Sequence, residues 1–222
     1  MPDAGPLPSL KREQAAWSRR ALLIGVDEVG RGPLAGPVVV AAVAFPPRIR
    51  RIPGVRDSKT LSGRQRAELV PRIRNAALAV HVAAASVREI DRLNIRRATA
   101  LAMRRAVLRV VNGRGFRERA AEAGVAEYRV LLDGLPMPEC GFEHEALVDG
   151  DALCYSIAAA GIFAKEIRDR LMRQLAHRYP GYGWEQNVGY ATAQHCEAIN
   201  TLGPTKHHRL SFTPVAQMVL GL

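Results

Sequence analysis

The residues of this chain that could carry chemistry are acids at the ends of apolar, strand-like segments. Asp27 and Glu28 follow "ALLIGV", Asp133 follows "YRVLL", and Asp149 and Asp151 end the segment "HEALVDGD". A carboxylate at the end of a buried strand costs free energy unless it is solvated, paired or bound to a cation. A single such acid is commonly a turn residue or a helix cap, and Asp133 and Asp151 each fit that description. Acids on three neighbouring strands favour a cation site instead.

The types of these residues narrow the choice of cation. No histidine or cysteine stands directly beside the acids, and a site of oxygen ligands alone suits Mg²⁺ or Mn²⁺ rather than zinc. Two such ions can activate a water and stabilise the leaving oxygen of a phosphodiester. In a regular strand, however, the neighbours Asp27 and Glu28 point to opposite faces. The glycines that follow suggest that the strand ends or bulges there, which would turn Glu28 back toward the site.

The charge of the chain favours a polyanionic partner. Its 222 residues include 32 Lys and Arg against 21 Asp and Glu, a net charge of +11 at pH 7. Such a field attracts nucleic acid or an anionic membrane surface, although a general bias toward arginine is an alternative explanation. No stretch of about 18 uninterrupted apolar residues is present, so no membrane partner is expected. The three cysteines (Cys140, Cys154 and Cys196) are widely spaced, which predicts reduced thiols in a cytoplasmic protein.

The order of the predicted elements indicates an α/β fold. A helix capped by Ser62 is expected over residues 62–78, with a kink or break at Pro71. Further helices are expected over residues 88–111 and 152–179. Segments of strand length lie at residues 21–27, 36–45, 79–87, 128–134 and 144–151. Because the first two strands are joined by a short connection, we expect them to be antiparallel neighbours in a mixed five-stranded sheet flanked by helices.

Seven segments carry a resemblance to a known family. In order, they are "DEVGRGPLAGPVV", "DSKTLS", "IDRLNI", "LLDG", "GDALCYSIAAAGIFAKEIRDR", "GYATAQH" and "HHRLSF", between residues 22 and 212. One hexapeptide such as "DEVGRG" could arise by chance, whereas coincidence does not account for seven ordered segments at compatible spacings. The sequence resembles ribonuclease HII, the type 2 ribonuclease H.

The resemblance implies a ribonuclease H-like fold with a C-terminal helical extension. We therefore divide the chain into a flexible N-terminal tail (1–18, with three prolines and no periodic pattern), a catalytic domain (19–183) and a helical extension packed on it (184–222). The implied activity is metal-dependent endonucleolytic cleavage of the RNA strand of RNA–DNA hybrids. It includes incision 5′ of ribonucleotides embedded in duplex DNA, leaving 3′-hydroxyl and 5′-phosphate ends. We expect a monomer whose partners are these hybrids and duplexes.

The resemblance also assigns roles to individual residues. The family's four catalytic, metal-binding acids map onto Asp27, Glu28, Asp133 and Asp151, which selects Asp151 over Asp149. Together they would hold two Mg²⁺ or Mn²⁺ ions.

Substrate binding maps onto a second set of residues. The glycine–arginine–glycine of the family is Gly30, Arg31 and Gly32, whose backbone would approach the ribose 2′-hydroxyl. Tyr190 in "GYATAQH" matches a tyrosine that stacks on the next deoxyribose; without the resemblance it would be read as a packing residue.

Other matched positions have weaker signals. Ser58 and Lys59 in "DSK" are expected to contact phosphate, although a solvated turn would also explain this tripeptide. Lys165 in the long helix is expected to approach a phosphate or the acids, and Asn94 is expected to be structural. For the "HHR" segment, residues 207–209, packing and DNA contact are equally compatible with the sequence.

Two departures from the family pattern lie in the long helix. Gly161 stands where serine is usual, at a cost of up to about 1 kcal/mol in helix stability relative to alanine, and Glu166 stands where valine is frequent. Neither is expected to touch the chemistry. Two alternatives remain: a ribonuclease that needs runs of ribonucleotides, and a non-catalytic basic protein that only binds duplexes.

Overall fold

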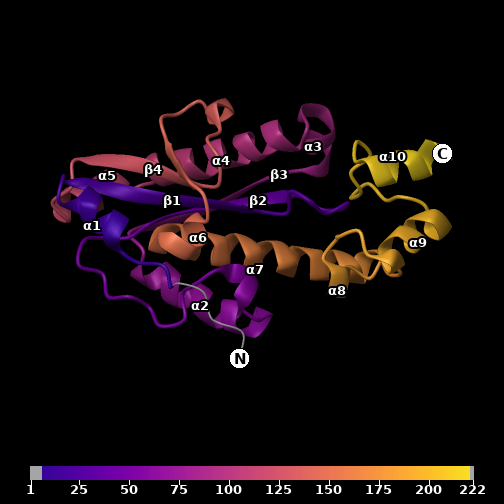
Figure 1. The fold of residues 1–222 in the computed structure, drawn as a ribbon, viewed down its shortest axis with the longest axis horizontal. Coiled ribbons are helices and arrows are strands. Elements are labelled where there is room, and N and C mark those ends of the chain that lie inside the picture. The colour runs from indigo at the N-terminus through magenta and orange to yellow at the C-terminus, as the bar shows by residue number, and fades with distance from the viewer. Residues whose placement is uncertain (1–6, 221–222) are drawn as a thin grey trace.

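The computed structural model describes residues 7–220, which form a five-stranded mixed sheet flanked by helices (Figure 1). The strands are β1 (Ala21–Val29), β2 (Val38–Ala44), β3 (Ala79–Ala85), β4 (Glu127–Asp133) and β5 (Glu145–Leu147). Their order across the sheet is β3-β2-β1-β4-β5. The pair β1–β2 is antiparallel as predicted, β2–β3 is antiparallel too, and β1, β4 and β5 run parallel. The predicted α/β architecture is therefore confirmed.

Two helical layers cover the sheet. One face packs against α4 (Ile95–Val111), and the other against α7 (Tyr155–Arg178), with α2 (Gly63–Ala76) beyond it (Figure 1). The remaining elements are α1 (Lys11–Trp17), η1 (Ser58–Thr60), α3 (Val87–Leu93), α5 (Phe116–Glu122), η2 (Pro138–Cys140), α6 (Gly150–Leu153), α8 (Trp184–Asn187), α9 (Ala193–Leu202) and α10 (Thr213–Leu220).

Strand alternation decides which β1 side chains face which layer. Leu22, Ile24 and Val26 belong to the apolar cluster under α4, while the residues between them face α7. The pairing with β2 continues without interruption through Glu28 and Val29. The expected bulge or strand end at this point is therefore wrong, and Asp27 and Glu28 do leave the strand on opposite sides.

Several predicted helix boundaries were inexact. Ser62 caps α2 as expected, in a reciprocal pair with Gln65, but the helix is not broken at Pro71, so an expected break there is wrong. The single helix expected over residues 88–111 is two helices. Asn94 separates them with a φ of 68°, and its side chain accepts a hydrogen bond from the Arg97 N–H, which confirms a structural role.

The expected strand ending at Asp151 is shorter than predicted. β5 ends at Leu147, and Asp151 lies in the first turn of α6. The long helix expected over residues 152–179 is likewise divided, because Cys154 is extended between α6 and α7. The apolar run thus spans a strand, a turn and a helix start, which periodicity alone does not separate.

The N-terminal segment is ordered where a flexible tail was expected. Residues 11–17 form α1, and Glu13 on this helix is 1% exposed. One Glu13 carboxylate oxygen accepts hydrogen bonds from the backbone N–H and the hydroxyl of Ser156, at 2.7 and 2.8 Å. It thereby places a carboxylate at the N-terminus of α7, where the helix dipole favours an anion. The flexible-tail prediction is wrong over this segment, and residues 1–6 lie outside the described part.

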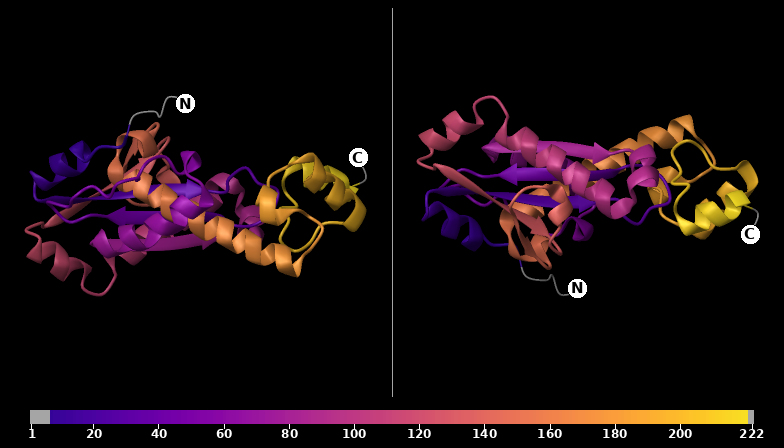
Figure 2. Two further views of the ribbon diagram at one scale, coloured as in Figure 1. Left: turned by 90° about the horizontal axis from the view of Figure 1, so that it is seen from below. Right: turned by 90° about the horizontal axis from the view of Figure 1, so that it is seen from above.

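Helices α8, α9 and α10 gather at one end of the molecule, beyond the sheet (Figure 2). Trp184, Tyr182 and Ile199 form an apolar cluster there with Met172 of α7. A domain boundary near residue 184 stays a prediction. Across the described residues, no helix has the length and apolar character needed to cross a membrane. The three cysteines are free thiols.

Candidate active site

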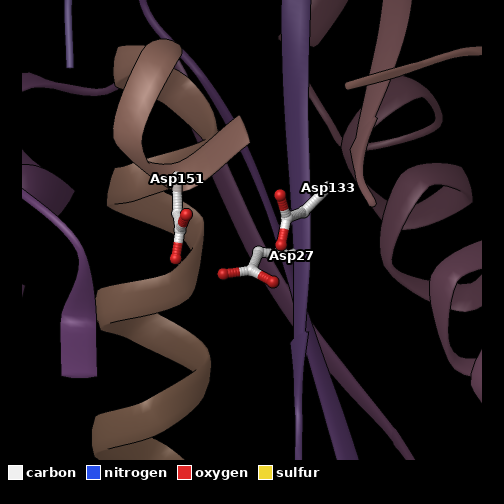
Figure 3. A group of neighbouring side chains, drawn as sticks. All are labelled: Asp27, Asp133 and Asp151. Atoms are coloured by element: carbon white, nitrogen blue, oxygen red, sulfur yellow. The ribbon is translucent and has the colours of Figure 1, made fainter. Parts of the chain in front are cut away.

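The fold brings three of the predicted acids together. Asp27 of β1, Asp133 at the end of β4 and Asp151 of α6 each place a carboxylate oxygen within 4.8 Å of the others (Figure 3). Because β1 and β4 are parallel neighbours, their carboxyl ends meet at the same edge of the sheet. We call these three residues the acid cluster.

Local structure holds each acid in the cluster. Asp133 accepts a hydrogen bond of 2.8 Å from the Gly150 N–H, which ties β4 to the start of α6. Asp151 lies 3.5 Å from the ammonium group of Lys59, so the "DSK" turn reaches the cluster. Asp149 is outside it and has a left-handed backbone instead. The choice between Asp149 and Asp151, which spacing left open, is thus made by the turn before α6.

The acid cluster is electrostatically unfavourable by itself. Burial raises the pKa of Asp27 well above its usual range, and the charges of Asp133, Glu28 and Asp151 raise it further. Burial likewise raises the pKa of Asp133, and burial and Asp133 together raise that of Asp151. Like charges held this close oppose ionisation unless a cation lies between them. An oxygen-only donor set of this kind fits Mg²⁺ or Mn²⁺.

Glu28 lies at the rim of the site rather than in the cluster. Its carboxylate pairs with Arg31 at 3.3 Å, and burial raises its pKa despite that positive charge. It is nevertheless close enough for its charge to affect Asp27. Its assignment as a metal ligand stays a prediction.

A cavity of about 440 Å³ joins three of the four predicted acids to all of the other predicted site residues. It is lined by Asp27, Glu28, Val29, Gly30, Arg31, Gly32, Ser58, Lys59, Arg66, Asp133, Lys165 and Tyr190. Every residue predicted for the site is in this lining except Asp151, which borders it through Lys59. Segments separated by up to about 160 positions in the chain therefore face one space.

Comparisons with known proteins show the family of the chain. The family model described as Ribonuclease HII matches residues 24–215. The curated Ribonuclease HII of Synechococcus sp. (strain JA-3-3Ab) is 49% identical over 217 residues, which cover 96% of this chain and 92% of that protein. That of Ralstonia pickettii (strain 12J) is 47% identical, over 96% and 87% of the two chains. The chain belongs to the ribonuclease HII family.

Solved structures show the same fold at lower identity. The ribonuclease H2 of Pyrococcus horikoshii OT3 superposes with a TM-score of 0.70 at 24% identity, covering 89% of this chain and 96% of that one. A Bst-RNase HIII solved in complex with Mn²⁺ superposes with a TM-score of 0.69 at 23% identity, covering 90% of this chain and 70% of that one. The predicted ribonuclease H-like fold is confirmed. As a family member, the chain is a ribonuclease H, an endonuclease that hydrolyses phosphodiester bonds.

Two lysines among the predicted site residues have different surroundings. Lys59 is largely exposed and reaches Asp151, and Asp57 orders its turn by accepting a hydrogen bond from the Lys59 N–H at 2.9 Å. Lys165 is instead paired with Asp169 at 2.8 Å, within α7. Its ammonium group therefore points to a carboxylate of its own helix rather than to the acid cluster.

Arg66 also lines the cavity, although no sequence motif predicted it as a site residue. It is buried, pairs with Asp169 at 2.8 Å and donates a hydrogen bond of 3.3 Å to the Ser58 carbonyl. Glu166, the departure thought to be remote from the chemistry, lies 3.9 Å from the same guanidinium. The sequence signal for Arg66 is its position four residues after the Ser62 cap, because one helical turn returns the Arg66 side chain to the loop before the cap.

Gly161 is also closer to the chemistry than expected. A Cβ built at this position would contact Oδ2 of Asp27, and the Ser58 hydroxyl lies near it. The missing side chain thus leaves room for the Asp27 carboxylate between β1 and α7. The expectation that this departure does not touch the site is wrong.

Two residues of the "HHR" segment, His208 and Arg209, are buried, and His207 is partly buried. His208 is 1% exposed, and its Nδ1 accepts a hydrogen bond of 2.8 Å from the Thr205 N–H. Its Nε2 lies 3.1 Å from Nε2 of His195, whose Nδ1 donates to the Tyr190 carbonyl at 2.8 Å. Of the two alternatives, packing is therefore correct for His208. Through His195 it supports the backbone of the predicted deoxyribose-contacting residue.

Proposed function

We propose that this ribonuclease H cleaves the RNA strand of RNA–DNA hybrids and also incises duplex DNA on the 5′ side of an embedded ribonucleotide, leaving 3′-hydroxyl and 5′-phosphate ends. The observation that carries this proposal is the shared cavity. It brings a carboxylate cluster together with the backbone of residues 30–32, of which Arg31 and Gly32 are exposed, and a half-exposed aromatic ring. A site able to cleave a phosphodiester and a site able to recognise the adjoining sugar would thus be adjacent.

The acid cluster, with Glu28 at its rim, would hold divalent metal. The support is chemical: the donors are all carboxylates, and each of the three clustered acids has a raised pKa in the absence of a cation. Bst-RNase HIII, which has the same fold, was solved in complex with Mn²⁺, an ion that suits oxygen donors. Bound Mg²⁺ or Mn²⁺ would supply an activated water and stabilise the departing 3′ oxygen.

The residues that read the substrate act through shape. Gly30 and Gly32 carry no side chain, so the backbone of residues 30–32 can approach a ribose closely, and a 2′-hydroxyl can both donate and accept hydrogen bonds. A side chain at Gly32 would begin 3.9 Å from the ring of Tyr190, which is 43% exposed. We infer that the backbone contacts the ribose of the ribonucleotide and that Tyr190 packs on the deoxyribose that follows.

Positive side chains around the cavity would hold the phosphates. Arg31 and Lys59 both line it, and their side chains are 48% and 77% exposed. Phosphate contacts by arginine and lysine release counterions, so duplex binding should weaken steeply as salt is added.

The experiment that tests the proposal is cleavage of a DNA duplex containing one ribonucleotide, with the cut position mapped. Incision on its 5′ side that requires Mg²⁺ or Mn²⁺ and stops in EDTA is the expected result. Cleavage of an RNA–DNA hybrid, together with no cleavage of the single-ribonucleotide duplex, would identify a ribonuclease that needs runs of ribonucleotides. Binding without cleavage of either substrate would leave only the duplex-binding alternative.

A further inference from the structure

Two buried arginines surround the loop that follows β1. Arg209 and Arg168 are both fully buried, and among the described residues neither has a carboxylate within ion-pair distance. We call these two residues the arginine clasp. Burying a cation without an anionic partner costs several kcal/mol of folding free energy. The backbone oxygens that accept hydrogen bonds from the two arginines must therefore take the place of the anion.

Among the residues that the structure describes, the partners of the Arg209 side chain are carbonyl groups of this loop. Its Nη2 donates to the Gly30 oxygen at 2.6 Å, its Nη1 donates to the Arg31 oxygen at 2.8 Å, and its Nε and Nη2 both donate to the Gly36 oxygen. Burial and the charge of Arg168 lower the pKa of Arg209 to about 9, so it stays protonated at neutral pH. One side chain near the C-terminus thus fixes three peptide groups of the loop.

Arg168 connects the same loop to the segment that carries Tyr190. From α7 it donates to the oxygens of Pro37 at 3.1 Å, Ala35 at 3.0 Å and Val188 at 2.9 Å. Val188 is two residues before Tyr190, so the loop and the tyrosine segment share one guanidinium.

Gly30 is shaped to fit this arginine. Its φ is +96°, a conformation that side chains rarely adopt, and a Cβ there would collide with Nε of Arg168. The Arg168 side chain can therefore occupy its place only because residue 30 is a glycine.

The direction of the carbonyls determines the direction of the N–H groups. In a trans peptide the C=O and the following N–H point to opposite sides. Since the carbonyls of Gly30 and Arg31 face Arg209, the N–H groups of Arg31 and Gly32 face away from it, and both residues line the cavity. Within residues 7–220, no hydrogen bond is made by either N–H. Two backbone donors are thus left available on the substrate side.

We propose that Arg209 and Arg168 are positioning residues for substrate selection. Arg209 turns the N–H groups of Arg31 and Gly32 toward the ribose, and Arg168 ties that loop to Tyr190 so that the two sugar contacts keep a constant separation. The inference rests on the proposed function, because it assumes that the loop reads a ribose.

The test compares two affinities in a cleavage-deficient Asp133→Asn background with Mg²⁺ present. The probes are two duplexes of identical sequence, one of DNA only and one with a single ribonucleotide. The parent should bind the ribonucleotide duplex more tightly. Arg209→Lys retains the charge, but an ammonium group cannot match the planar fork that spans three carbonyls. It should reduce this preference by about fivefold, which is the loss of about one hydrogen bond, and leave the affinity for the DNA-only duplex unchanged.

Controls separate positioning from general damage. Arg117→Lys, on α5 at the opposite end of the molecule from α8–α10, should change neither affinity (Figure 1). A purely structural role for Arg209 would weaken both duplexes equally, and an unchanged preference would overturn the inference while leaving the proposed function intact. No preference in the parent would overturn both.

A second variant decides the question if Arg209→Lys does not fold. Asp91 anchors the residues after Arg209 from the surface, by accepting hydrogen bonds from the Leu210 N–H at 3.2 Å and the Ser211 hydroxyl at 2.6 Å. Asp91→Ala loosens this segment without removing a buried group. It should lower the ribonucleotide preference by about twofold, and retention of the full preference would overturn the inference.

Discussion

The acid cluster and the arginine clasp are neighbouring regions of one site with opposite electrostatic designs. In the acid cluster, like charges raise the pKa of Asp27 and Asp151. Within the part of the chain that the structure describes, the only close cation is Lys59, at 3.5 Å from Asp151. In the clasp, every nitrogen of the two guanidinium groups donates to a backbone carbonyl. The negative charges of the acid cluster are balanced only when a cation binds. The hydrogen bonds of the arginine clasp form without a ligand.

This contrast assigns different physical tasks to the two regions. A cluster that depends on an external cation should respond strongly to metal and to changes of carboxylate charge. A clasp made of internal hydrogen bonds should instead respond to changes that disturb packing or protonate the buried histidines beside it.

Loss of one cluster carboxylate should remove cleavage and spare binding. Asp133→Asn is expected to lower the cleavage rate by at least about a thousandfold, or about 4 kcal/mol, because a ligand and its charge are lost together. Duplex affinity should be retained. Single-turnover cleavage and equilibrium binding measure the two effects. Asp149→Asn is the matched control, since that acid is outside the cluster and asparagine tolerates its left-handed backbone; retained cleavage in Asp133→Asn would contradict the metal assignment.

Acid should destabilise the histidine region next to the clasp. Burial and the neighbouring His195 and His207 lower the pKa of His208 from 6.5 to about 4. Because the unfolded chain takes up this proton first, stability falls as the pH drops through 6.5 and continues to fall toward 4. The His208 contribution to this loss is about 2 kcal/mol between pH 7 and pH 5.

Denaturant unfolding in EDTA at both pH values measures this loss. His208→Gln removes the titrating group, so its stability should fall less over the same interval, whatever its stability at pH 7. Equal pH dependence in the two proteins would show that His208 is not held in the neutral form.

Gly161 provides a finer test of the acid cluster. Gly161→Ala introduces a Cβ against the Asp27 carboxylate and should raise the Mg²⁺ concentration for half-maximal cleavage by about tenfold, or about 1.4 kcal/mol. Gly161→Ser should cost less, because its hydroxyl can donate to the displaced carboxylate. Metal titrations of cleavage compare the pair, and an alanine variant equal to the parent would show that Asp27 does not need this space.

The smallest effect is a gain of stability. In EDTA at pH 7, Asp27→Asn should raise the free energy of unfolding by about 1 kcal/mol, a few degrees in Tm, because a carboxylate whose pKa is raised in the folded state opposes folding once it is ionised. By the same sign, the Asp27 contribution to the free energy of unfolding of the metal-free parent should rise as the pH falls through that raised pKa toward the unfolded value of 3.8, opposite to the contribution of His208. Mg²⁺ should stabilise the parent and not the variant. A lower Tm for the variant in EDTA would contradict the description of the cluster as repulsive.

Much of the fold was predictable because its signals are local. Continuous apolar runs predicted the positions of β1 and β2, and the short connection between them predicted their antiparallel pairing. The Ser62 cap was predictable because serine is a favoured N-cap residue, and a glutamine three residues later completes a capping box. The helix α1 was not predicted, because seven residues give too little periodicity and its buried Glu13 is explained only by its contact with α7.

The sequence by itself determined the residue types of the site and the family to which the chain belongs, because the motifs are contiguous and their order along the chain can be read directly. The tertiary structure alone decided which acids meet, since strand alternation separates Glu28 from Asp27 and the turn before α6 brings Asp151 to the cluster. It alone showed that Gly161 faces a carboxylate and that Arg209 faces a loop 178 or 179 positions away in sequence. Such contacts depend on the packing of distant segments, and no spacing along the chain encodes them.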